Sequence, residues 1–224
     1  MTHRNTLLVS MLLAALLLIS GSAFAQVTPE YRVTIYNLTY AQPISPPLVA
    51  AHTNDVAIFE IGQPAIPELA TLAEDGSPAS LAELLGSLSQ VADVATAGGP
   101  IGPGGAAEIM VSGARPFHRL SIVGMLVNTN DAFFGIDTIT APRRRFESVE
   151  VYGLAYDAGS EANNEDCDFI PGPACAGAGA GVRDEGDAEG FIHIHRGIHG
   201  TADLDPAAHD WRNPVVKIVI TRVR

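Results

Sequence analysis

The sequence is poor in charged, basic and aromatic residues. Only 17% of its 224 residues are charged, and 13 Lys and Arg stand against 25 Asp and Glu, which gives a formal net charge of −12. This balance argues against binding to nucleic acid or to anionic lipid, because both require a positive protein surface. Aromatic residues make up 6% of the chain, so no aromatic platform typical of a carbohydrate-binding module is evident.

The common motifs of catalysis are also missing. The sequence contains no G-x-S-x-G elbow, no glycine-rich phosphate loop and no H-E-x-x-H pair. These motifs carry nucleophilic, nucleotide-dependent and zinc-protease chemistry respectively. We therefore expect a protein that is not an enzyme and that uses no organic cofactor.

Long apolar runs are limited to one, at residues 7–19. Arg4 precedes it, and Ala23-Phe24-Ala25 follows it with the small residues of a cleavage site. The run is shorter than the ~20 residues that a membrane-spanning helix needs. We expect residues 1–25 to be a signal peptide, and residues 26–224 to form one secreted or periplasmic domain without a transmembrane segment.

Cysteine is scarce as well, and its two occurrences, Cys167 and Cys175, lie close together in a Gly- and Ala-rich stretch. In an oxidising compartment such a pair usually forms a disulfide. A metal-binding pair is the alternative, but the C-x-x-C spacing typical of one is absent. We therefore predict a disulfide.

Short runs with strand-like composition are what the chain has in abundance. They predict an all-β fold, an antiparallel β-sandwich with a small helical insertion. The predicted strands are residues 31–39, 56–61, 108–112, 118–127, 148–156, 190–195 and 215–223. Helical spacing of leucines predicts helices at residues 64–73 and 80–91, and the glycine-rich residues 95–106 and 167–190 are predicted loops.

Acidic side chains follow two of the predicted strands. Asp131 comes soon after the long apolar strand, and Asp157 and Glu161 follow the strand that begins at Ser148. If both loops meet at one edge of the sandwich, these carboxylates supply the hard oxygen ligands that calcium prefers. Asp and Gly in loops are also common turn formers, which is the alternative interpretation.

Several segments are similar to a known family when read in order. They are YRVTIYNLTYAQPISPP, AHTNDVAIFEIGQPAIPELATLAEDG, SIVGMLVNTNDAFFGID, VYGLAYDAGSE, GFIHIHRGIHG and DWRNPVVKIVITRV. Together they resemble the spondin domain, a module of F-spondin that also occurs alone in bacterial secreted proteins. The resemblance implies an antiparallel β-sandwich with calcium held at its loop end by Asp131, Asp157 and position 161. Here that position is Glu161, where animal members have aspartate.

The resemblance also implies a non-catalytic role in adhesion or recognition at the cell surface. The partner would be an extracellular protein or glycan that the sequence does not name. A second group of side chains, His193, His195 and His199, predicts an alternative. Three imidazoles are a set that zinc or copper uses, as in a metal-dependent enzyme or a metal-capture protein. The simpler interpretation is that these imidazoles bond to loop backbone.

Overall fold

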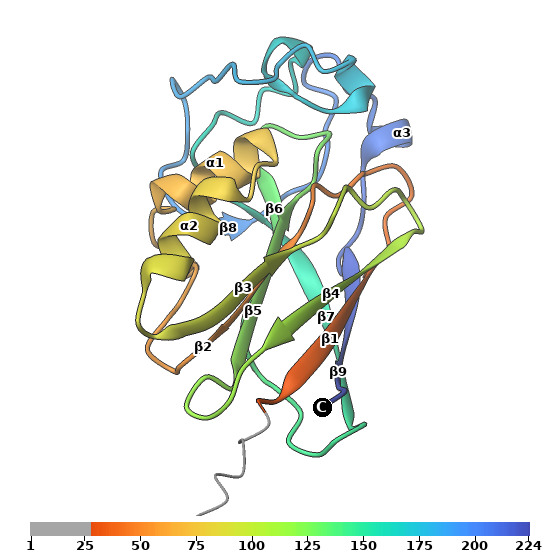
Figure 1. Ribbon diagram of the computed structural model, residues 1–224. Coiled ribbons are helices and arrows are strands. Elements are labelled where there is room, and N and C mark those ends of the chain that lie inside the picture. The colour runs from red at the N-terminus through yellow and green to blue at the C-terminus, as the bar shows by residue number, and fades with distance from the viewer. Residues whose placement is uncertain (1–27) are drawn as a thin grey trace, which may run out of the picture.

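The computed structural model describes residues 28–224, so the predicted signal peptide lies outside the described residues. The described chain is dominated by strands that run roughly along its long axis, with two helices against one side (Figure 1). The strands are β1 (Glu30–Asn37), β2 (Leu48–His52), β3 (Val91–Thr96), β4 (Ala106–Ser112), β5 (Arg119–Met125), β6 (Ala132–Thr140), β7 (Ser148–Asp157), β8 (His193–Ile194) and β9 (Val216–Arg222). The helices are α1 (Pro67–Asp75), α2 (Ala79–Ser87) and α3 (Pro206–His209).

The strands pair antiparallel in the order β3-β2-β5-β6-β7-β9-β1-β4, and β8 adds to β7. The two edge strands approach each other. A hydrogen bond joins them, in which the backbone N–H of Ser112 in β4 donates to the Asp93 carboxylate in β3 (2.7 Å). The sheet therefore curls until it is nearly closed, and its two halves face each other as the layers of a sandwich. This arrangement confirms the predicted all-β fold.

Strand β7 belongs to both halves of the sandwich. Its first part pairs with β9, from Ser148 opposite Thr221 to Gly153 opposite Val216. Its last residues pair with β6 on one side, and Asp157 lies opposite Ala132. The same end of β7 pairs with β8 on its other side. The end of β7 is thus held from two directions, which fixes the residues at that edge.

Two apolar clusters hold the fold together. The larger fills the space between the two halves of the sheet and includes Val33, Phe134 and Ile218. The second lies between the outer face of the β2–β5–β6 half and the helices, and includes Phe133 and Leu69. Because strands in this half are covered on both faces, they bury consecutive residues, which offers each strand a large apolar contact area.

The helical insertion begins and ends at residues suited to helix ends. Pro67 stands in the first turn of α1, where a missing N–H is tolerated, and Gly76 ends the helix with φ of 68°. The buried leucines of the two helices lie on one face of each and are Leu69, Leu72, Leu81 and Leu85. That face covers the sheet, which confirms the small helical insertion.

Some boundaries differ from the sequence prediction. Residues 56–61 form no strand, although Val56 and Ile58 are buried in alternation. Their side chains pack into the cluster under the helices, while the backbone N–H of Ile58 donates to Asp137 (3.0 Å). Conversely, β2, β3 and β6 are strands that the sequence analysis did not identify. The second helix ends at Ser87, and within residues 190–195 only β8 is a strand.

The predicted disulfide is present. Cys167 and Cys175 are joined, with their Cα atoms 5.0 Å apart, and each lies in a short 3-10 turn, Cys167–Phe169 or Pro173–Cys175. The bond closes a short segment within the long loop between β7 and β8. In the part of the chain that the structure describes, every helix falls short of the length or apolarity needed to cross a membrane.

Candidate metal centre

The acidic residues singled out from the sequence meet at the end of the sandwich where β6 begins and β7 ends, away from the two ends of the described chain (Figure 1). Asp131 immediately precedes β6 and Asp157 is the last residue of β7. Because Ala132 pairs with Asp157, the two aspartates leave neighbouring strands at the same edge. Glu161 follows in the loop after β7. All three side chains are buried.

Asp131 connects the two loops through its carboxylate. Its Oδ2 atom accepts hydrogen bonds from the backbone N–H of Ser160 (2.8 Å), the hydroxyl of Ser160 (3.2 Å) and the backbone N–H of Glu161 (3.1 Å). Its own carbonyl accepts from Ala158 N–H (3.2 Å). The other carboxylate oxygen, Oδ1, is buried and has no partner among the described residues. Half of this carboxylate therefore fixes the loop, and half remains available to a cation.

Asp157 sits in a tight turn that requires glycine two residues later. Its Oδ1 accepts the backbone N–H of Gly159 (2.8 Å), and its Oδ2 accepts the amide of Asn163 (2.6 Å). Gly159 has φ of +65°, and a Cβ placed there would lie 2.4 Å from the carbonyl oxygen of Phe191. Only glycine fits both the backbone conformation and the close approach. The turn thereby fixes the direction of the Asp157 carboxylate.

Glu161 is the least satisfied of the three acids. It is 1% exposed, and both of its carboxylate oxygens lack a hydrogen-bond partner among the described residues. The nearby cation Arg183 is engaged elsewhere, since its guanidinium contacts Glu74 and bonds Asp75 (2.7 Å) at the end of α1. A buried carboxylate in this condition is costly for the fold unless it is protonated or binds a cation.

The electrostatics of the cluster follow from this burial. Burial, with the Asp157 charge second, raises the pKa of Asp131 to about 8. Burial raises the pKa of Glu161 to about 8 as well, and Glu74 and Asp131 add to the effect. The pKa of Asp157 is also raised, mainly by burial. In the absence of a cation the cluster therefore holds protons at neutral pH.

One residue that the sequence analysis missed, Glu189, adjoins the cluster together with His193, which the sequence analysis had singled out. In the described residues, one set of three places a ligand atom of each member within 4.8 Å of the others, and it consists of Asp157, Glu189 and His193. Asp131, Asp157 and Glu161 are spread more widely than this. Opposite ligands of calcium lie about 5 Å apart, because each Ca–O distance is about 2.3–2.6 Å, so a calcium ion would have to draw the ligand atoms of these three acids to within that distance of one another. An acid four residues before a histidine, Glu189 and His193, is the sequence signal that could have revealed the set.

The three predicted histidines have different surroundings. His193 lies with its Nε2 atom 3.7 Å from Asp157 Oδ1 and 3.9 Å from Glu189 Oε1. His195 is buried against Trp211, and its Nδ1 accepts the backbone N–H of Gly197 (2.9 Å). Burial, more than any neighbouring group, lowers the pKa of His195 to about 3, so its ring is neutral.

The backbone at His199 is fixed by Glu165. This buried carboxylate accepts the N–H groups of His199 (2.6 Å), Gly200 (2.6 Å) and Thr201 (2.8 Å). The His199 ring belongs to the wall of a separate pocket. Because the His195 ring bonds the backbone N–H of Gly197, the simpler interpretation of the histidines, as groups that bond to loop backbone, describes His195 well.

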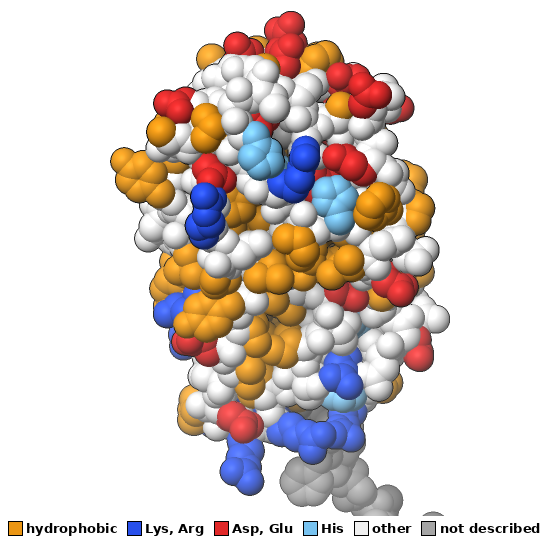
Figure 2. All heavy atoms as spheres, turned by 180° about the vertical axis from the view of Figure 1, so that it is seen from behind, with side chains coloured by type: hydrophobic (Ala, Val, Ile, Leu, Met, Phe, Trp, Pro, Cys, Tyr) orange, Lys and Arg blue, Asp and Glu red, His pale blue; other side chains and the backbone are white. Residues whose placement is uncertain are grey.

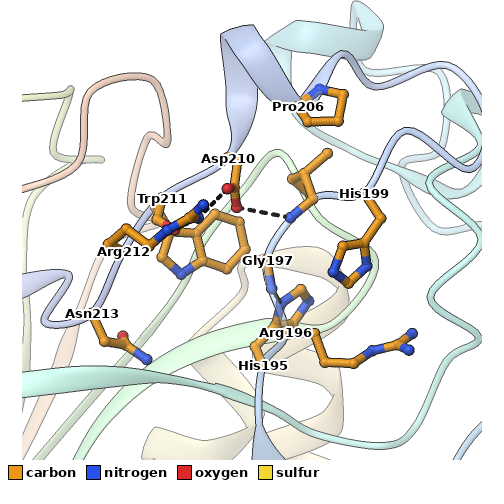
Figure 3. Close-up of a pocket in the computed structure, with 10 residues that line it drawn as sticks. His195, Arg196, Gly197, His199, Pro206, Asp210, Trp211, Arg212 and Asn213 are labelled. Atoms are coloured by element: carbon orange, nitrogen blue, oxygen red, sulfur yellow. Dashed lines mark hydrogen bonds and ion pairs between the residues drawn. The ribbon is translucent and has the colours of Figure 1, made fainter.

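That pocket lies beside His195 and has a volume of about 470 Å³ (Figure 3). Figure 3 shows the rings of His195 and Trp211 facing each other, with Arg196 and His199 on the same side as His195. Asp210 links the two sides, because its carboxylate accepts the N–H of Ile198 (3.1 Å) and contacts Arg212. The pocket combines cationic, aromatic and acidic groups next to the acidic cluster.

The surface around this end is chemically mixed. Figure 2 shows histidine, arginine and acidic side chains interspersed on the upper part of the rear face, and a broad apolar area below them. Basic side chains gather instead at the opposite end, near the two ends of the described chain. The net negative charge is thus unevenly distributed along the molecule.

The three buried acids, the neighbouring histidine and the pocket are the features that any functional assignment has to explain. No protein-family model matches the chain, and comparison with curated proteins finds no match.

Proposed function

We propose that this protein is a secreted, non-catalytic calcium-binding β-sandwich that acts in adhesion or recognition at the cell surface. One observation carries the calcium assignment. Asp131 Oδ1 and both carboxylate oxygens of Glu161 are buried at the same end of the fold without hydrogen-bond partners among the described residues. Three such oxygens beside Asp157 form a site in which a cation replaces the missing partners.

The chemistry of the donors favours calcium. The unpartnered atoms are all carboxylate oxygens, which are hard ligands, and Glu161 can offer both of its oxygens to one ion. Backbone carbonyl groups of the two loops and water would complete a shell of six to eight ligands. A neighbouring lysine or arginine could neutralise the cluster instead, but Arg183 already pairs with Glu74 and Asp75.

Recognition is proposed for the loops that the ion would order. Asp131 already bonds the loop after β7 at Ser160 and Glu161, so an ion bound by the same carboxylates would stiffen this segment further. The pocket beside His195 lies next to these loops and offers charged and aromatic groups to an extracellular protein or glycan. The disulfide between Cys167 and Cys175 is compatible with an oxidising location outside the cytoplasm.

The calcium site is tested by thermal unfolding with calcium and with a chelator, together with elemental analysis. At calcium concentrations about 100 times Kd, binding stabilises the fold by about 2.7 kcal/mol, which raises Tm by roughly 5–10 °C for a domain of this size. Glu161→Gln should remove most of this rise. Glu108→Gln makes the same change on the exposed face of β4, where it should leave the calcium response intact.

An unchanged Tm on chelation, with no calcium found in the protein, would refute the calcium assignment. A calcium response that Glu161→Gln leaves at full size would place the ion elsewhere.

A further inference from the structure

A second cluster of ligand atoms lies on the solvent side of the acidic site. Asp157, Glu189 and His193 each place a ligand atom within 4.8 Å of the other two, and His193 Nε2 lies 3.7 Å from Asp157 Oδ1 and 3.9 Å from Glu189 Oε1. The amide of Asn163 donates to both Asp157 Oδ2 (2.6 Å) and Glu189 Oε1 (3.0 Å), so one side chain holds the two carboxylates together. The three groups come from the end of β7, the following loop and β8, and are positioned before any ion binds.

The hydrogen bonding of His193 decides what its Nε2 atom can do. Its Nδ1 lies 3.1 Å from the carbonyl oxygen of Ile194. A carbonyl has no hydrogen to give, so Nδ1 carries a proton, and in the neutral ring Nε2 presents its lone pair. That lone pair faces two carboxylate oxygens. Three acceptors converge without a hydrogen between them, which is an arrangement that a cation stabilises.

The same bond is typical of a metal-binding histidine. Imidazoles that ligate metals usually donate their other N–H to a carbonyl or carboxylate, which fixes the ring and the tautomer. Ile194 provides that acceptor for His193.

His195 is excluded by the opposite argument. Because its Nδ1 accepts the N–H of Gly197, the proton of the neutral ring is on Nε2. That N–H lies 3.9 Å from Asp157 Oδ2 and has no hydrogen-bond partner among the described residues. Neither ring nitrogen of His195 is free to bind a metal, so the set expected from the sequence is replaced here by one histidine and two acids.

We propose that Asp157, Glu189 and His193 form a separate site for a divalent transition metal of the zinc class. A mixed set of imidazole and carboxylate suits zinc, whereas calcium prefers oxygen alone. In a tetrahedral zinc site with bonds of about 2.0–2.2 Å, neighbouring ligand atoms lie about 3.3–3.6 Å apart. The observed 3.7 and 3.9 Å separations from His193 need only a small contraction.

The site is also accessible. The side chains of His193 and Glu189 are 20% and 27% exposed, while Asp157 is buried beneath them. An ion can therefore enter from solvent, and water can take the fourth position. Asp157 belongs to both proposed sites and lies between them, whereas His193 and Glu189 belong to this one only.

The test measures zinc in the purified protein in the presence of saturating calcium, by elemental analysis after dialysis and by titration. Cobalt substitution provides a spectroscopic signature of imidazole coordination. Wild type should bind one zinc per chain at this site. His193→Ala should weaken the binding on the order of a hundredfold or more, since losing a ligand costs more than losing the hydrogen bond that orients one.

Glu189→Gln should weaken zinc binding in the same direction and serves as the second variant if His193→Ala fails to fold. His118→Ala is the matched control, because His118 is a half-buried histidine whose ring bonds only the carbonyl oxygen of Pro116. Glu161→Gln should remove most of the calcium response and retain zinc, which separates the two sites. Zinc affinity that His193→Ala leaves unchanged, or wild type that binds no zinc, would overturn the proposal.

Discussion

The Asp131 carboxylate accepts a hydrogen bond from the backbone N–H of Glu161 across 3.1 Å, so a residue before β6 fixes a residue after β7. The bond joins two loops that are 30 residues apart in sequence. It also places the acid side chain of Glu161 in the same buried region as Asp131. Two carboxylates held together in this way repel when both are ionised, and this property leads to the first two predictions.

Calcium binding should release protons. Asp131 and Glu161 each have a pKa of about 8 in the fold, so both are largely protonated at pH 7. An ion that binds their oxygens displaces these protons, and we expect roughly one to two per calcium at pH 7 and almost none at pH 10. Titration in a weakly buffered solution measures the release. A release that does not change with pH would contradict the assignment of these two acids as ligands.

The calcium-free protein should lose stability as pH rises. The folded pKa of about 8 for Glu161 exceeds the unfolded value of about 4. Between these values the folded state binds more protons, so the free energy of unfolding falls as pH increases and levels off above pH 8. Glu161→Gln should therefore stabilise the chelated protein at pH 8 by roughly 1–3 kcal/mol. Chemical denaturation at pH 5 and pH 8 checks both the fall in wild-type stability and the gain from Glu161→Gln, with Glu108→Gln as the control.

Gly159→Ala should disrupt the turn that directs Asp157. The backbone has φ of +65°, and the new Cβ would lie 2.4 Å from the Phe191 carbonyl oxygen. We expect a loss of at least about 2 kcal/mol, and weaker binding of both metals. Gly181→Ala is the matched control, because Gly181 has φ of +73° and open space around it, so it should cost only about 1 kcal/mol. Equal losses in the two variants would show that the contact with Phe191 is unimportant.

His195 should make the protein sensitive to acid. Its pKa of about 3 in the fold lies below the unfolded value of about 6.5, so the unfolded state binds the extra proton. This contribution to stability is complete above pH 6.5 and is lost as the pH falls toward 3. His195→Asn keeps an acceptor for Gly197 N–H but does not titrate. As the pH is lowered from 7 to 4, the free energy of unfolding should therefore fall more for wild type than for this variant.

Much of the site followed from the sequence because the acids stand next to strand ends. Asp131 and Asp157 flank β6 and β7, and antiparallel pairing brings such flanking residues together. Strand β6 itself was missed because Phe133 and Phe134 are both buried, one under the helices and the other inside the sandwich. A strand covered on both faces does not alternate between polar and apolar residues.

Glu189 could not be assigned from composition because it lies in a long polar loop. Its position depends on Asn163, which is 26 residues away and bonds both it and Asp157. The roles of the histidines likewise depend on backbone partners, Ile194 for His193 and Gly197 for His195. Such bonds fix tautomers, and a tautomer is a property of the folded loop that spacing alone does not reveal.

Strands β1 and β9 are neighbours, with Tyr31 opposite Arg222, so the two ends of the described chain emerge side by side. They do so at the end of the molecule that is far from the start of β6 and the end of β7, where the acidic residues lie (Figure 1). A tether at either end of the described chain would consequently orient the domain so that its acidic loops face away from the anchoring surface. Immobilisation through an N-terminal or a C-terminal tag should therefore give the same exposure of the loops, and a fused neighbour on either side would leave them accessible to soluble ligands.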